Sequence, residues 1–254
     1  MTVYFIGAGP GAADLITLRG MRLLQQAPLV LYAGSLVAQE MLQYCHAGAE
    51  IIDTAGLDLD QQTGHYRRAK ANGWDVARLH SGDPALYGAT AEQMRRLKAL
   101  GIAYQVVPGV SSYSAAAAAL GSELTKPGVA QTVILTRSEG RSSPMPDGES
   151  LDSLAAHGTT LCLFLSGAKL KQTVETLLPR YGADAPVALL RRVSWPDQQI
   201  YRGVLGRLLH EVEGKDWRLT TLLLVGPVLA DESGDDSRLY AADYVHAFRR
   251  ARDE

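Results

Sequence analysis

The sequence is organised around short apolar runs that end in glycine-rich turns and are separated by amphipathic segments. In the first half, the strand-like runs are 3–7, 28–33, 75–80 and 103–109. Their apolar character is continuous rather than alternating, which is typical of strands in a sheet covered on both faces. Helical patterns are predicted for 15–26 and 90–100. A chain that alternates strand and helix in this way is predicted to form an α/β fold with a mainly parallel sheet.

A second series of runs follows a pause in the apolar pattern near 120–130. Its strand-like runs are 131–137, 159–166, 186–192 and 220–229, and its helical runs are 168–179 and 204–213. The 254 residues suffice for two domains of ordinary size. We therefore expect two α/β domains, over 1–120 and 121–254. The small-residue helix predicted for 110–120 would permit close approach of a partner chain, and 137–150 has the composition of an exposed loop.

Composition excludes several classes of function. The formal net charge of −2 provides no general attraction for nucleic acid or for anionic membranes. The sequence does not begin with a basic leader, so no signal peptide is expected. No apolar stretch approaches the roughly 18 residues that a membrane span needs. Two cysteines without a C-x-x-C motif suit a reducing, cytoplasmic setting. The six histidines are scattered, so no metal site is expected.

The first turn, "GAGPGA" at 7–12, matches the dinucleotide fingerprint G-x-G-x-x-G/A by letter. That function needs a helix starting at the third glycine, whereas the helical pattern here begins only near Asp14. It also needs an acidic residue at the end of the second strand, but the next acid is Glu40, beyond that strand. A flavin or nicotinamide oxidoreductase is therefore disfavoured. A tight turn without any ligand remains an alternative.

Three further glycine-rich turns follow strand-like runs, at 80–88, 107–112 and 165–167. In open parallel sheets, ligands bind just outside the carboxyl ends of the strands. Asp83 precedes Pro84, which restricts its backbone. Its carboxylate could meet a ligand cation such as an α-ammonium, or could close an Asx-turn in its own loop. Ser111 and Ser112 could likewise contact a ligand or cap the helix that follows.

With these turns in this order, the chain resembles the tetrapyrrole methylase family, the S-adenosyl-L-methionine-dependent C-methyltransferases of cobalamin and sirohaem synthesis. The resemblance is carried by "GAGPG…DLITLRG" (7–20), "SGDPALYG" (81–88), "VPGVSSYSAAAAALG" (107–121), "LFLSG" (163–167), "VSWPDQQIYRGVL" (193–205) and "TTLLLVG" (220–226). Segments 31–37 and 78–97 are most similar to members that methylate C11 of precorrin-4. One position departs from the family, because Ala12 stands where an Asp is usual; Asp14 could substitute for it or only cap the next helix.

The resemblance implies two α/β domains, usually in a homodimer, with S-adenosyl-L-methionine in the cleft between the domains. The family's cofactor contacts carry over to Pro10, Gly82, Asp83, Leu86, Ser111, Ser112, Ser166, Val193 and Thr221. The implied substrate is a corrin precursor rich in carboxylates, which guanidinium groups pair with well. Candidate partners for those carboxylates near predicted strand ends or loops are Arg19, Arg137, Arg141, Arg191 and Arg192.

No nucleophile–base pair is visible in the sequence, which fits a reaction in which a substrate carbon is the nucleophile. A base could still remove the proton lost after methylation, and His80, Tyr87 and Tyr113 are the candidates. The position of His80 is more typical of a strand-end hydrogen bond. The sequence leaves open a methyltransferase acting on precorrin-2 at C20, on precorrin-3 at C17 or on uroporphyrinogen III. A carrier that holds a corrinoid without turnover also remains open.

Overall fold

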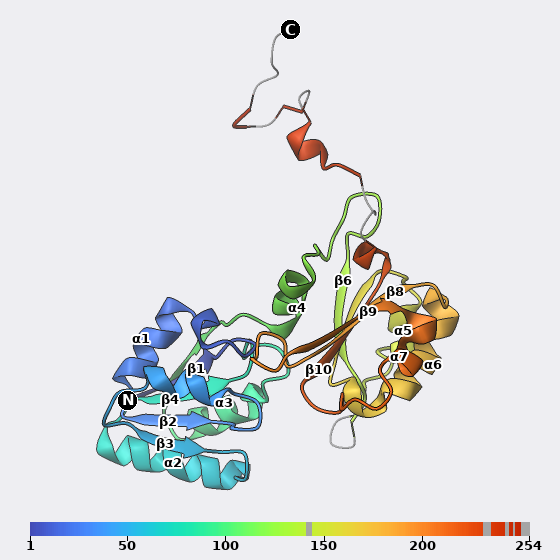
Figure 1. Cartoon of the computed structure of the whole chain (residues 1–254). Helices are drawn as coiled ribbons and strands as arrows, with labels where there is room; N and C mark the ends of the chain where they lie inside the picture. The colour runs from blue at the N-terminus through green and yellow to red at the C-terminus, as the bar shows by residue number, and fades with distance from the viewer. Residues whose placement is uncertain (141–143, 231–234, 242–243, 246, 250–254) are drawn as a thin grey trace. The chain divides into compact units, whose positions relative to one another are not determined.

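The computed structural model describes residues 1–140, 144–230, 235–241, 244–245 and 247–249, and its chain divides into two compact units (Figure 1). The first unit comprises Met1–Ala116 together with Arg192–Gln199. The second comprises Ala117–Arg191 and Ile200–Glu254. The segment Arg192–Gln199 thus groups with the first unit although it follows a strand of the second.

The first unit is built on a five-stranded sheet in which every pairing is parallel. Its order is β3-β2-β4-β1-β5, with β1 at Thr2–Gly7, β2 at Leu29–Tyr32, β3 at Glu50–Asp53, β4 at Val76–His80 and β5 at Ala103–Val107. The register pairs Gly7 with His80 and Ile6 with Val107. The turns that follow β1, β4 and β5 therefore emerge at the same edge of the sheet.

Helices cover both faces of this sheet, as the continuous apolar runs predict. Ile6 packs in one buried cluster with Leu24 of α1 (Leu18–Gln26), whereas Phe5 packs in another with Tyr66 of α2 (Leu59–Asn72). Successive residues of a strand point to opposite faces, so these two clusters lie on opposite sides of β1. The remaining helices are α3 (Thr90–Ala99), which adds to the second cluster, and α4 (Ser112–Leu120).

Helix α1 starts well after the first turn. Its N-cap is Thr17, whose hydroxyl accepts a hydrogen bond from the Gly20 amide at 3.1 Å. Only a single 3-10 turn, Ala13–Leu15, lies between Gly11 and that cap. The helix N-terminus is thus displaced from the glycines, which removes the arrangement that a dinucleotide turn needs.

The second unit has a mixed sheet in the order β6-β7-β10-β8-β9. Its strands are β6 (Val133–Arg137), β7 (Thr160–Phe164), β8 (Pro186–Arg191), β9 (Gln199–Val204) and β10 (Thr221–Val225). Strand β6 runs parallel to β7, but β10 runs antiparallel to both β7 and β8. The expectation of a mainly parallel sheet therefore holds for the first unit, while the second departs from it. Apolar runs report burial and carry no information about strand direction.

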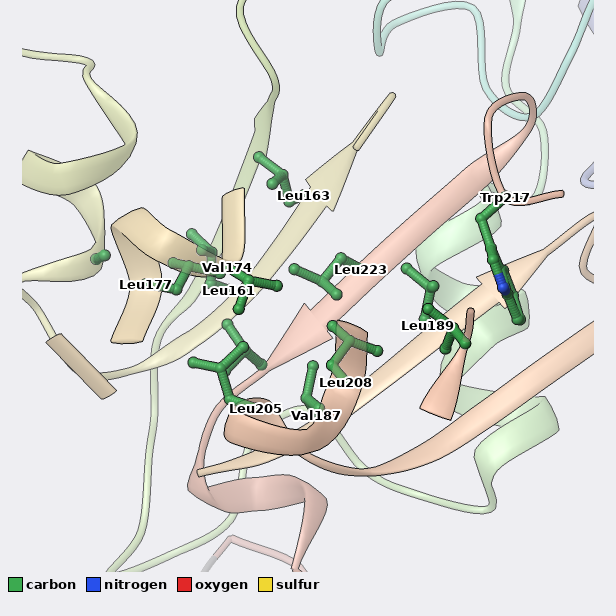
Figure 2. Close-up of a cluster of buried hydrophobic side chains, with 13 residues drawn as sticks. Leu161, Leu163, Val174, Leu177, Val187, Leu189, Leu205, Leu208, Trp217 and Leu223 are labelled. Carbon is green, nitrogen blue, oxygen red and sulfur yellow. The ribbon is translucent and has the colours of Figure 1, made fainter. Parts of the chain in front are cut away.

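A single cluster of apolar side chains forms the core of the second unit (Figure 2). Leu161 of β7, Leu189 of β8 and Leu223 of β10 meet Leu177 there. The helices of this unit are α5 (Leu151–Ala155), α6 (Leu170–Tyr181) and α7 (Leu208–Glu211). Across the described ranges of both units, we find no helix with the length and apolar character needed to cross a bilayer.

Candidate active site

Three strand-end turns of the first unit are tied together by backbone hydrogen bonds. Gly82 donates to the Gly9 carbonyl at 2.7 Å, and Gly9 donates back to the Gly82 carbonyl at 3.3 Å. These bonds join the turn after β1 to the turn after β4. The Gly109 amide donates to Oδ2 of Asp83 at 3.1 Å, which joins the turn after β5 to the same group.

Glycine is required here because the three backbones lie nearly in contact. A Cβ on Gly7 would lie 2.5 Å from the Gly109 Cα, and a Cβ on Gly109 would lie 2.3 Å from the Gly82 carbonyl oxygen. Gly82 has φ +64°, a conformation that other residues adopt only with strain. The turns therefore form one closely packed, rigid edge at the carboxyl end of the sheet, the usual place for a ligand in this kind of fold.

Asp83 uses one carboxylate oxygen within its own loop and the other to hold the turn after β5. Oδ1 accepts from the Ala85 amide at 2.7 Å, while Oδ2 accepts from Gly109. The sequence left open two roles for Asp83, an Asx-turn and a contact with a ligand cation, and the bond to Ala85 forms the Asx-turn. A carboxylate can accept further hydrogen bonds, so a contact with a ligand cation stays a prediction.

The serines at the start of α4 lie beside Gly82. A Cβ on Gly82 would be 3.6 Å from the Ser111 Cα and 3.8 Å from the Ser112 amide nitrogen. The Ser111 carbonyl accepts the first hydrogen bonds of α4, from Ser114 and Ala115. Neither serine hydroxyl bonds to any of the described residues. Both hydroxyls therefore remain available to a ligand at this edge.

Segment Arg192–Gln199, which is distant in the sequence, forms hydrogen bonds with the turn between β1 and α1. Trp195 Nε1 donates to the Pro10 carbonyl at 2.9 Å, and the Ala12 amide donates to Oγ of Ser194 at 3.0 Å. A Cβ on Gly11 would lie 2.2 Å from the Trp195 ring. Sequence reasoning selected the neighbouring Val193 and missed these two side chains, although both lie in the quoted "VSWPDQQIYRGVL" segment.

Ala12 borders a pocket of about 440 Å³ in the first unit. Asp14, Glu40, Tyr44 and Trp195 also line it. The N-cap of α1 is Thr17, so the alternative that Asp14 caps this helix is wrong. Asp14 and Glu40 thus line the same pocket as Ala12.

His80 is buried at the end of β4, with a relative exposure of 7%. Burial, and secondly the nearby Arg78 charge, lower its pKa to about 3, against a smaller opposing effect of a backbone hydrogen bond with Gly88. The ring is therefore neutral at physiological pH, and so low a pKa makes it a weak base. Tyr87, with φ +54°, is 46% exposed, and Tyr113 is half-buried on α4.

This low pKa predicts a specific pH dependence of stability. In the unfolded chain His80 has a pKa near 6.5, so below that pH the unfolded state gains a proton that the folded state does not. The contribution is present above pH 6.5 and is lost as pH falls toward 3. Between pH 7.5 and 5 the loss should be about 2 kcal/mol. Urea unfolding of the wild type and of His80→Asn at both pH values measures it, and an equal loss in the two proteins would contradict the assignment.

The other predicted cofactor contacts divide between the two units. In the first unit, the Leu86 amide donates to the Asp83 carbonyl at 3.2 Å, and Val193 is buried beside Ser194. In the second unit, Ser166 and Thr221 flank one end of the β7–β10 ladder. The Thr221 hydroxyl donates to the Trp217 carbonyl at 2.7 Å, whereas Ser166 Oγ is buried without a partner.

The predicted arginines occupy different environments. Arg19 is exposed on α1, and Arg192 pairs with Asp197 at 2.7 Å while lying 4.1 Å from the centre of the Trp195 ring. In the second unit, Arg137 donates to the Pro144 carbonyl, and Arg191 Nε is buried without a partner. Arg141 lies outside the described residues. Among the residues that are described, no cluster of three or more His, Cys, Asp or Glu is suited to a metal ion.

Comparison with known proteins identifies close relatives along nearly the whole chain. A precorrin-4 C(11)-methyltransferase of Pseudomonas aeruginosa is 55% identical over 249 residues, which cover 98% of this chain and 99% of the relative. The solved structure of a cobalt precorrin-4 methyltransferase matches with a TM-score of 0.86 and 43% identity, covering 90% of this chain and 96% of the other. A uroporphyrin-III C-methyltransferase from Thermus thermophilus, solved with S-adenosyl homocysteine, matches at 28% identity and a TM-score of 0.76, covering 90% and 99%.

The family profile described as Tetrapyrrole (Corrin/Porphyrin) Methylases matches residues 2–209. This range includes the glycine turns of the first unit, the Trp195 segment and most of the second sheet. Because this family model matches most of the chain, and a relative is 55% identical over nearly the whole of both chains, the chain belongs to the tetrapyrrole methylase family.

Proposed function

We propose that this protein is an S-adenosyl-L-methionine-dependent methyltransferase that methylates C11 of precorrin-4 in cobalamin biosynthesis. The observation that carries the proposal is the 55% identity, end to end, with a precorrin-4 C(11)-methyltransferase. The metal-free substrate is favoured over the cobalt form because the relative named for cobalt precorrin-4 is less similar, at 43% identity.

The residues of the first unit fit a cofactor held mainly by backbone groups. Gly7 and Gly109 leave no space for a side chain, and Gly82 has a positive φ, so a ligand at this edge would meet mainly peptide groups. The Ser111 and Ser112 hydroxyls next to them have no partner among the described residues. In the second unit, the buried and unpartnered Ser166 Oγ is a further candidate contact.

When bound, S-adenosyl-L-methionine supplies a methyl group already activated on a sulfonium. The chain then has to orient the substrate carbon and exclude water, and alignment of this kind can lower a barrier by several kcal/mol. The rigid edge formed by the three turns suits such a positioning role. His80 is a weak base for the final proton loss, which leaves Tyr87 and Tyr113 as candidates. Arg19, Arg137, Arg141, Arg191 and Arg192 remain proposed contacts for the substrate carboxylates, and a homodimer is the proposed assembly.

Two measurements test this function. Isothermal calorimetry should detect S-adenosyl-L-homocysteine binding at one molecule per chain, and the ligand should raise the melting temperature. Incubation with S-adenosyl-L-methionine carrying a labelled methyl group and with precorrin-4 should give a singly methylated product labelled at C11. Absence of calorimetric heat and of any melting shift would sink the proposal.

Parallel incubations with precorrin-2, precorrin-3 and uroporphyrinogen III separate this activity from its relatives. The label position identifies the carbon that receives the methyl group. Turnover with one of these compounds and none with precorrin-4 would move the protein to another member of the family. Tight binding of the methylated product without turnover would indicate a corrinoid carrier instead.

A further inference from the structure

Strand β4 carries a buried arginine that has no carboxylate partner. Arg78 is 6% exposed, and its guanidinium donates to Thr54 Oγ1 at 2.8 Å, to Gln62 Oε1 at 3.3 Å and to Gln93 Oε1 at 3.3 Å. All three acceptors are neutral. None of the ion pairs found within the described ranges includes Arg78.

An arrangement of this kind is costly for a protein that binds nothing there. A buried charge is tolerated when it is paired and fully hydrogen-bonded, and arginine keeps its charge even when burial lowers its pKa. Gln93 is held in place because its Oε1 also accepts from the Tyr66 hydroxyl and its amide donates to the Ala89 carbonyl. The three acceptors therefore fix the guanidinium while leaving its charge uncompensated. A guanidinium also has more N–H donors than these three bonds use.

Arg78 lines a pocket of about 320 Å³ that lies within the first unit. His80, Gln62, Tyr87 and Gln93 also line it. Glu92 also lines the pocket, but none of the ion pairs among the described residues joins it to Arg78. The pocket thus offers a positive charge that no ion pair among the described residues neutralises, next to the turn that follows β4.

We propose that this pocket binds a carboxylate group of a ligand, with Arg78 as its charge partner. This inference rests on the proposed function, which brings two carboxylate-bearing molecules to the same turn. One is the tetrapyrrole, through its acidic side chains, and the other is S-adenosyl-L-methionine, through its amino-acid carboxylate. The turn at 80–88 contributes His80, Ser81, Tyr87 and Gly88 to this pocket, but Arg78 is not among the five arginines selected from the sequence.

Gln62→Glu tests the proposal with almost no change of shape. The new carboxylate would stand where Gln62 Oε1 now lies, 3.3 Å from Nη2 of Arg78, and would supply the missing counter-charge from within the protein. A ligand carboxylate should bind at least tenfold more weakly. The substitution also loses the hydrogen bond that the Gln62 amide donates to the Leu57 carbonyl at 3.0 Å, so the melting temperature is measured to show that the variant is folded. Gln61→Glu is the matched control, because it adds the same charge on the same turn of α2 at an exposed position outside the pocket.

The probes distinguish the two sources of the carboxylate. Uroporphyrin III, a stable polycarboxylate tetrapyrrole, is titrated by fluorescence quenching, and S-adenosyl-L-homocysteine is titrated by calorimetry alongside 5′-methylthioadenosine, which lacks the amino-acid portion. Weaker binding of uroporphyrin III alone assigns the pocket to the macrocycle. Weaker binding of S-adenosyl-L-homocysteine, with 5′-methylthioadenosine unaffected, assigns it to the amino-acid carboxylate. Gln61→Glu should change each dissociation constant less than twofold.

A second variant, Arg78→Gln, removes the positive charge and should weaken the same probe as Gln62→Glu does. If either folded variant binds all three probes as the wild type does, Arg78 belongs to a structural network only and the proposal is overturned. It is also overturned if Gln61→Glu has the same effect as Gln62→Glu. The proposed function is judged separately, by whether the wild type binds S-adenosyl-L-homocysteine at all.

Discussion

Gly109→Ala is expected to destabilise the protein by about 3 kcal/mol and to abolish S-adenosyl-L-homocysteine binding. Its Cβ would lie 2.3 Å from the Gly82 carbonyl oxygen and 2.7 Å from the Gly7 Cα. Both obstacles are backbone atoms at strand ends, which cannot rotate away as a side chain can. Insertion of a methyl group into such a contact forces backbone shifts of that energetic scale. Urea unfolding and calorimetry measure the two effects.

Two other glycine-to-alanine variants show whether the loss of stability in Gly109→Ala comes from the backbone contact or from replacing any glycine. Gly64 lies inside α2 with open space around it, so Gly64→Ala should stabilise the protein by roughly 0.5–1 kcal/mol. Gly82→Ala meets no close atom and should cost only the strain of its positive φ, roughly 1 kcal/mol. If Gly109→Ala cost no more than Gly82→Ala, the turns would be looser than the structure indicates.

The sequence located most strands of the first unit because their residues are apolar on both sides. Strand β3, Glu50–Asp53, escaped that criterion because it is an edge strand whose side chains alternate between partly buried and exposed. Helix α2 also escaped it, although a readable signal was present. Asp58 and Gln61 form a reciprocal capping box at its start, and Gly73 ends it in the left-handed conformation.

The candidate site was predictable where the chain presents a local pattern and less so where distant segments meet. The glycine turns after β1, β4 and β5 follow from their positions at strand ends. The hydrogen bonds of Ser194 and Trp195 span 182 and 185 residues, and no local spacing reveals them. The sequence placed Arg78 in a buried strand but gave no sign of its role. The absence of a counter-charge can be seen only when all its neighbours in the fold are known. Strand β10 was located within the run 220–229, but its antiparallel direction was not predicted, because strand direction depends on how the elements are connected.

Trp195→Ala is expected to raise the dissociation constant of S-adenosyl-L-homocysteine at least tenfold. The ring packs on Gly11, its Nε1 donates to the Pro10 carbonyl at 2.9 Å, and its face meets the Arg192 guanidinium. Loss of the ring removes the restraint on the turn that carries Pro10, which is a proposed cofactor contact. A tenfold change in the dissociation constant corresponds to about 1.4 kcal/mol of binding free energy. Trp195→Phe, which loses the N–H donor but keeps an aromatic ring, should have an intermediate effect in calorimetry.

Trp74→Ala provides the matched control, because Trp74 is also half-buried in the first unit but packs on the cluster around Phe5. It should lower stability while leaving the dissociation constant unchanged. A double-mutant cycle then tests the contact itself. Gly11→Ala alone drives a methyl group into the Trp195 ring, but in the Trp195→Ala background that obstacle is gone. The cost of Gly11→Ala should therefore fall sharply in the double variant. Costs that add to within about 0.5 kcal/mol would mean that the ring does not restrain the turn.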